Sequence, residues 1–235
     1  MFPPLARAAM IALVGLTAIP GIILLTMAGW PDMFQGAPMA ETMAGLSATQ
    51  GILTTGLFFF TVSGLLWAPA LWFVLDRSRD AGGHRDAVSL AGLFIAASLA
   101  VRVAWYGANA TATPIAAEIW ATGGPAERAA LDVMLQLIND VLSTAQEDIG
   151  VNLIGSAALL LIGLEIIRLR VFPRWLGYMA VVTSLLFVIS SAEMVGLNAG
   201  QTVAIAAPSL MNFWFLFMAV AMIRTRASDP QRITP

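Results

Sequence analysis

Cysteine and lysine are missing from this sequence of 235 residues, which also holds a single histidine, His84. Without cysteine there can be no disulfide, thiolate metal site or iron–sulfur cluster. One histidine cannot supply a bis-histidine haem or an H-E-x-x-H zinc site. The absence of lysine excludes a Schiff base to retinal or pyridoxal phosphate and a Walker-type phosphate loop. The sequence therefore predicts no cofactor and no metal site.

Charge is scarce as well: 11% of the residues are charged and 59% are hydrophobic, with a mean hydropathy of +0.82. An average soluble domain is about 25% charged. The polar residues are too few to cover a globular particle, so the surplus apolar surface must face lipid. We therefore expect an all-α, polytopic transmembrane helical bundle. The net charge of −2 argues against nucleic acid as a partner.

Six stretches are apolar enough to span a bilayer, which takes about 20 residues. They cover about residues 8–29, 51–75, 87–108, 149–167, 175–195 and 202–223. The first is longer than the apolar run of a signal peptide, which has about 7–15 residues, and no clear A-x-A site follows it. We expect it to be retained, in a single transmembrane domain over residues 1–226 followed by a polar tail, 227–235.

The arginines predict the orientation of these spans. If the N-terminus is cytoplasmic, the cytoplasmic segments contain Arg7, Arg77, Arg79, Arg85, Arg168, Arg170, Arg174, Arg224, Arg226 and Arg232, whereas the outer segments contain only Arg128. This distribution follows the positive-inside rule and places both termini in the cytoplasm. Tryptophans agree, with Trp105 near the outer interface and Trp175 near the inner one. We expect the protein in a bacterial cytoplasmic (inner) membrane.

The outer side carries an additional amphipathic helix, predicted over residues 125–147. It begins after Gly123-Gly124, with Pro125 at the favoured first position. At 100° per residue, its apolar face contains Leu131, Met134, Leu135, Ile138, Val141, Leu142 and Ala145. Gly150 is the only breaker before the fourth span, and one glycine costs just ~1 kcal/mol, so we favour a continuous or slightly bent helix.

Arg102 is the most informative residue, because an arginine inside a span costs ~2.5 kcal/mol or more. It has Ser98 one turn before it and Tyr106 one turn after it. A ligand-binding or ion-pathway role competes with a structural ion pair and with a side chain that snorkels to the headgroups. Glu193 is the expected partner, because the two lie about 22 and about 27 Å from the inner boundary.

The predicted ligand-binding set is polar and lies towards the outer side: Arg102, Tyr106, Asp148, Asn152 and Glu193. Asp148, Asn152 and Ser156 step by four, so they share one face of the fourth helix. Glu165 stands three residues before Arg168, which predicts a local ion pair at the inner interface. No catalytic residue is predicted.

One segment, Val171–Tyr178, resembles an uncharacterised bacterial family of integral membrane proteins. These proteins are similar in length and carry a Pro-Arg-x-Leu-Gly element before the penultimate helix, here residues 173–177. The acidic outer helix before the fourth span is similar too. The family has no established activity, so the resemblance implies architecture alone. In physical terms, Pro173 starts a helix, Arg174 anchors it inside and Gly177 allows close packing.

Three functions remain open on this sequence. The first is a non-enzymatic bundle that acts as an accessory or sensing component, or binds a lipid or small apolar molecule from the outer leaflet. The second is a small transporter or channel that uses the outer polar cluster. The third is a membrane-embedded enzyme acting on a lipid, in which Arg102 holds an anionic headgroup. The expected partners are membrane lipids, with another membrane protein or a second copy of the chain as a further option.

Overall fold

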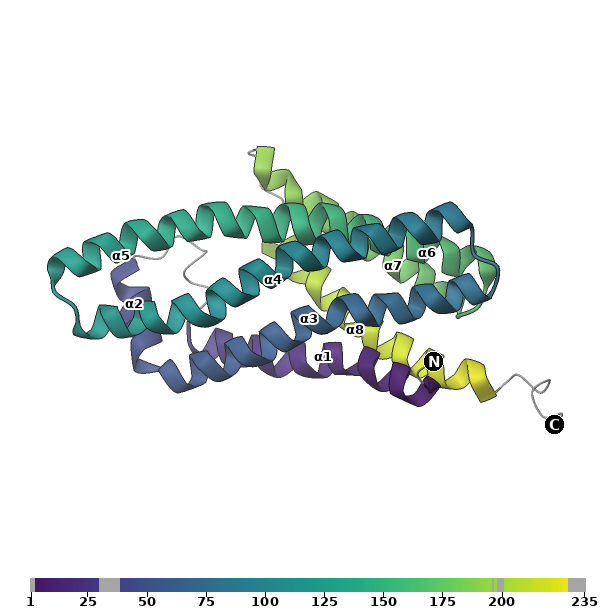
Figure 1. Cartoon of the computed structure of the whole chain (residues 1–235), viewed down its shortest axis with the longest axis horizontal. Coiled ribbons are helices and arrows are strands. Elements are labelled where there is room, and N and C mark those ends of the chain that lie inside the picture. The colour runs from purple at the N-terminus through teal and green to yellow at the C-terminus, as the bar shows by residue number, and fades with distance from the viewer. Residues whose placement is uncertain (1–2, 30–38, 196, 198–200, 228–235) are drawn as a thin grey trace.

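The computed structural model describes residues 3–29, 39–195, 197 and 201–227 (Figure 1). Every regular element in this part of the chain is helical, which confirms the predicted all-α class. The elements are α1 Pro4–Met27, α2 Met39–Ala48, α3 Gln50–Asp80, α4 Arg85–Thr122, α5 Pro125–Ile138, the wide helix η2 Asn139–Gly155, α6 Ser156–Leu169, α7 Arg174–Ser190, the short 3₁₀ turn η3 Ser191–Val195 and α8 Gln201–Ala227.

Five helical stretches in the described residues are long and apolar enough to cross a membrane. They are Leu5–Met27, Gln50–Asp80, Arg85–Thr122, Asp148–Leu169 and Ala206–Arg224. The chain therefore has the build of a multi-pass membrane protein. The fifth predicted span corresponds to α7, which is apolar but has only 17 residues. The count of six spans stays a prediction.

The helix ends that carry arginine gather at one end of the bundle, which we call the arginine end (Figure 1); the exception is the start of α5, which carries Arg128 at the opposite end. At the arginine end, α1 contacts α3, and α6 contacts the turn between α3 and α4. Arg7 of α1 forms an ion pair of 3.1 Å with Asp76 of α3, which Arg79 also contacts. The α6–α7 turn passes through Arg170, whose φ of 58° is left-handed. Which side of the membrane this end faces stays a prediction.

Helix α4 extends far beyond the span predicted over residues 87–108. Its 38 residues rise about 57 Å, against a hydrocarbon core of about 30 Å. Residues 109–122 are more polar, but they do not break the helix, and the Thr111 hydroxyl donates to the Gly107 carbonyl at 2.8 Å. The helix ends only at Gly123. The helix therefore continues past the span boundary predicted near residue 108, since hydropathy falls there without any helix-stopping residue, and the boundary of the span itself stays a prediction.

Elements α5, η2 and α6 follow one another without a break from Pro125 to Leu169. In η2 the backbone bonds run from i to i+5, which widens the helix. Of the predicted apolar face, Leu131 and Leu135 are buried, whereas Met134 and Val141 are 44% and 56% exposed. Met134 lies in α5, where the step of 100° per residue still holds, so the buried side of this helix is narrower than the predicted apolar face. In η2 this step no longer applies. The side chains of Ile138, Leu142 and Ala145 lie outside the described residues.

Two hydrophobic cores succeed each other along the bundle. The first fills the half nearest the arginine end and includes Ile11, Leu71, Leu159, Trp214 and Phe215. The second lies at the opposite end and includes Leu25, Met43, Leu46, Leu53, Trp105 and Leu135. Trp105 is 5% exposed and stands edge-on to Phe60, with ring centroids 6.2 Å apart. Trp105 therefore packs inside the protein, and its predicted level near the outer interface stays a prediction.

Helices α6 and α7 approach closely through Gly163 and Gly177. A Cβ atom added to Gly177 would lie 2.6 Å from Cγ1 of Ile167 and 2.7 Å from the carbonyl oxygen of Gly163. The predicted packing role of Gly177 is therefore confirmed. Pro173 precedes the first turn of α7, as its fixed φ favours.

Candidate functional site

Arg102 lies about 26 Å along α4 from the start of this helix at Arg85, at the level where the two cores meet. It is 5% exposed. Its Nε donates to the Ser98 hydroxyl at 3.3 Å, and its guanidinium carbon lies 4.2 Å from the ring centroid of Trp67 on α3. A desolvated cation over an indole contributes about 2 kcal/mol. The side chain therefore lies inside the bundle, and the snorkelling alternative does not fit.

The wide helix η2 packs directly against this arginine level. Ser98 donates its hydroxyl proton to the Gly150 carbonyl at 2.6 Å, so one hydroxyl joins Arg102 to η2. A Cβ atom on Gly155 would lie 3.1 Å from Trp67 and 3.3 Å from the Ser98 oxygen. Gly155 thus allows η2 to approach the arginine level closely.

Asp148 and Asn152 lie on η2 on either side of Gly150. The Asn152 amide donates to a carboxylate oxygen of Asp148 at 3.3 Å. Asn152 is 4% exposed and Ser156 is 1% exposed, whereas Asp148 is partly exposed. Ser184 of α7 donates to the Ser156 carbonyl at 2.8 Å, which extends the polar contacts across to α7.

Of the five predicted site residues, the structure thus brings Arg102 to the same level as Asp148 and Asn152. The side chains of Tyr106 and Glu193 lie outside the described residues, although their backbones belong to α4 and η3. The pairing of Arg102 with Glu193 stays a prediction. The described groups offer a guanidinium, hydroxyls, an amide and a carboxylate, a set that can hold a charge and orient a polar group.

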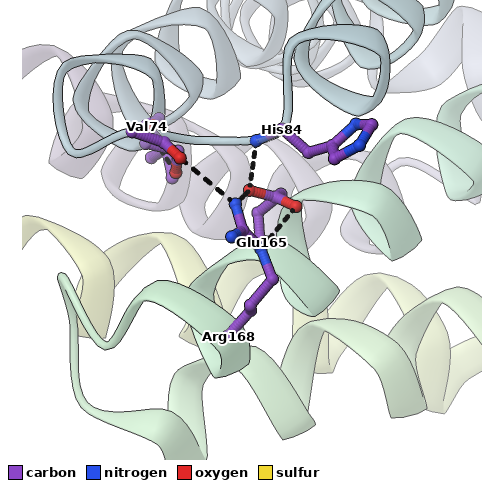
Figure 2. A network of polar contacts seen from close by, with 6 residues as sticks. Val74, His84, Glu165 and Arg168 are labelled. Atoms are coloured by element: carbon purple, nitrogen blue, oxygen red, sulfur yellow. Dashed lines mark hydrogen bonds and ion pairs between the residues drawn. The ribbon is translucent and has the colours of Figure 1, made fainter.

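A second polar cluster lies at the arginine end, around Glu165 (Figure 2). Arg168 contacts Glu165 at 2.6 Å, which confirms the predicted local pair. The backbone N–H of His84 also donates to Glu165 at 3.1 Å, and Arg168 reaches the Gly82 carbonyl at 3.4 Å. The pair therefore fastens the α3–α4 turn to α6. Sequence spacing revealed the local contact, but the contacts to the turn join residues distant in the chain.

An open groove of about 390 Å³ lies at the same end, between the start of α7 and the end of α8. Its lining residues are apolar with one exception: Pro173, Trp175, Phe217, Val220, Ala221 and Arg224. Trp175 and Phe217 meet edge-on with ring centroids 5.3 Å apart, and both are nearly half exposed. A volume of this size lies within the range of small-ligand sites, about 300–1,000 Å³.

Sequence reasoning missed this groove. The signal that could have revealed it is the spacing of Phe213, Phe217, Val220 and Arg224, which places them on one face of α8. The sequence predicts Trp175 at the inner interface, but it does not predict the contact of Trp175 with Phe217 of α8. The groove also lies at the arginine end, away from the polar cluster around Arg102 in which we expected a ligand.

Comparison with known proteins finds no match to the chain among protein-family models, curated proteins or solved structures. The resemblance of Val171–Tyr178 to an uncharacterised bacterial family therefore stays a prediction. The chain is a helical protein with the build of a multi-pass membrane bundle, and its function has to be argued from its own geometry.

Proposed function

We propose that this protein is a non-enzymatic bundle of the bacterial cytoplasmic membrane that binds a membrane lipid or a small apolar molecule. In this proposal the chain crosses the bilayer six times, with both termini in the cytoplasm. The groove between α7 and α8 is the observation that carries the binding function. It lies between two helices, and in this proposal it faces the bilayer, so that a lipid chain enters it without crossing water.

The character of the groove supports a lipid more than a water-soluble solute. Trp175, Phe217 and Val220 line it, each about half exposed. Covering apolar surface yields about 25 cal/mol per Å² only where the bound molecule displaces water. Within a bilayer no water is displaced, so packing and shape decide which acyl chain binds best. Aromatic side chains beside a small residue, here Ala221, form such a shaped surface.

Filling the groove tests this function. Val220→Trp places a large side chain in the groove, whereas Val182→Trp places the same side chain on α7 outside its lining. The two valines are 47% and 50% exposed, so the pair is matched in residue type and exposure. A phosphatidylcholine with a photoreactive acyl chain should label Trp175 or Phe217 in the unmodified protein. Val220→Trp should abolish this labelling and Val182→Trp should preserve it; equal labelling in the two variants refutes the binding function.

Transport of a small solute is the second candidate function. The specific observation is a buried arginine packed on a wide helix, because wide turns of this kind are frequent at functional sites. Flux into proteoliposomes, compared between the unmodified protein and Arg102→Gln, tests it. If Arg102→Gln removes the flux and leaves labelling of the groove unchanged, the result favours transport over lipid binding as the activity of the chain.

A further inference from the structure

The end of the bundle opposite the arginine end extends beyond the hydrocarbon layer if the chain spans the bilayer as proposed. Helix α4 rises about 57 Å, and a layer of about 30 Å takes only about 20 of its residues. Residues 109–122 therefore rise about 21 Å above the layer. Helix α5 runs back beside this extension and continues into η2 and α6, so it stands upright in water and does not lie on the lipid surface (Figure 1).

Helix α5 has two apolar sides, and the bundle covers only one of them. Leu131 and Leu135 are buried in the second core. At 100° per residue, four further apolar residues share the other side of the helix: Ala126, Ala130, Val133 and Met134. We call these four residues the α5 stripe. All four are exposed, Val133 by 68% and Met134 by 44%.

The α5 stripe has the form of a helix-docking surface. Contiguous apolar surface that faces water marks an interaction site, and lipid cannot cover this stripe where α5 stands above the hydrocarbon layer. Ala126 and Ala130 form an i, i+4 ridge of small side chains, along which a second helix can approach α5 closely. Val133 and Met134 continue the stripe with larger side chains that can pack against that helix.

The charges around the stripe select its partner. Residues 109–147 contain five carboxylates and one arginine. Glu127 lies seven residues before Met134, so the two are nearly in line along α5 and Glu127 borders the stripe. The one arginine, Arg128, lies over Trp120 of α4, with its guanidinium carbon 5.6 Å from the ring centroid, so its charge is directed towards α4. The stripe is therefore bordered by negative charge.

These negative charges are not neutralised within the part of the chain that the structure describes. None of the ion pairs there involves Glu118, Glu127 or Asp132, and Oδ1 of Asp132 is buried without a hydrogen-bond donor among the described residues. A second copy of the chain would bring an equal excess of carboxylates against them, and like charges across an interface are unfavourable. A cationic surface complements them.

We infer that the α5 stripe docks a cationic amphipathic helix of another protein, on the side of the membrane opposite the arginine end. Apolar residues of that helix pack on Val133 and Met134, and its lysines or arginines lie beside Glu127. One helix face buries less than a standard interface of about 1,600 Å², so the complex is transient. This inference goes beyond lipid binding, but it rests on the membrane placement proposed above.

A first measurement tests that placement. The chain contains no cysteine, so a single introduced cysteine reports on its own position. In nanodiscs, where water reaches both faces of the bilayer, a water-soluble maleimide should modify Val133→Cys rapidly and Val103→Cys slowly, because Val103 is 50% exposed but lies inside the predicted span. Slow modification of both places the stripe in lipid and overturns the inference. Rapid modification of both contradicts the membrane placement, and with it both the inference and the proposed function.

A second measurement tests docking with a synthetic helix of about 18 residues, or about 27 Å, with leucine on one face and lysine on the other. A control peptide has glutamate in place of lysine. Binding to the full-length protein in phosphatidylcholine nanodiscs is measured by fluorescence anisotropy, with empty nanodiscs as the blank. The lysine peptide should bind about tenfold more tightly than the glutamate peptide, and equal affinities overturn the inference.

Two matched pairs of variants locate the binding surface. Val133→Asn should weaken binding of the lysine peptide about tenfold, whereas Leu5→Asn, at a residue that is also 68% exposed but lies at the arginine end, should not. Glu127→Gln keeps an acceptor for the Gly124 N–H and should weaken binding about threefold, whereas Asp80→Asn removes the same charge at the arginine end without effect. Equal losses within either pair overturn the inference.

The oligomeric state, from native mass spectrometry, distinguishes a partner protein from a second copy. The unmodified protein and Val133→Asn should have the same oligomeric state. A dimer that Val133→Asn dissociates would show that a second copy covers the stripe, which overturns the inference. Val133→Asn should leave photolabelling of the α7–α8 groove unchanged, so failure of the docking surface and failure of the lipid-binding function are distinguishable.

Discussion

Replacing Gly177 by alanine should destabilise the bundle by separating α6 from α7. The added Cβ would lie 2.6 Å from the Ile167 side chain and 2.7 Å from the Gly163 carbonyl oxygen. A side chain can rotate away, but a backbone oxygen in a helix cannot, so the two helices must move apart. Overpacking of this kind costs up to about 3 kcal/mol, and alanine recovers about 1 kcal/mol of helix propensity, which leaves a loss of about 2 kcal/mol.

The matched control is Gly107→Ala in α4. A Cβ atom at Gly107 would have no neighbour within 4 Å, so this variant should gain about 1 kcal/mol from helix propensity. Thermal unfolding in one detergent separates the two variants, because 1 kcal/mol corresponds to about 2–4 °C in a chain of this size. Gly177→Ala should melt about 4–8 °C lower than the unmodified protein and Gly107→Ala slightly higher. Equal melting temperatures in the two variants would refute the close α6–α7 contact.

Three further predictions concern the arginine level and the topology. Ser98→Ala should cost about 1–2 kcal/mol of stability, because it removes the buried hydroxyl between Arg102 and η2. The control Ser89→Ala, on the exposed face of the same helix, should change stability by less than about 0.5 kcal/mol. Similar losses of the two variants in detergent melting would contradict the role of Ser98. Arg102→Ala and Glu193→Ala should each destabilise the protein, and the double variant should lose much less than their sum, so additive losses would refute the pairing. A reporter fused to the end of α8 should read cytoplasmic and one in the α4–α5 turn external; the same side for both would exclude the six-span topology.

Much of the bundle could be predicted from the sequence because the signals involved are local. Long apolar runs and the arginines beside them located the helices, and Pro173 marked the start of α7 where the structure has it. Glu165 and Arg168 were recognised as a pair because three residues bring two side chains together on any α-helix. Burial of Arg102 was one of several alternatives, because the sequence alone does not separate an arginine that faces the bundle from one that snorkels to the headgroups.

The parts that could not be predicted depend on packing between distant segments or on small backbone differences. The extension of α4 past residue 108 could not be predicted from the sequence, because Thr111 and its neighbours are polar but do not end a helix. The widening of η2 changes the angular step between residues, so a face computed for an ideal α-helix does not carry over to η2. The groove requires the start of α7 to meet α8, and nothing in either segment specifies its partner.

The shortness of α7 has a consequence for the surrounding bilayer. Its 17 residues rise about 26 Å, some 4 Å less than a hydrocarbon layer of about 30 Å. If α7 crosses the membrane as proposed, lipids along this flank must compress, at a cost of fractions of a kcal/mol per Å of mismatch. Lipids with shorter or more disordered acyl chains relieve that compression, so hydrophobic mismatch would enrich them beside α7. The same flank contains the groove, and the thickness of the host membrane would then tune which chain lengths reach it.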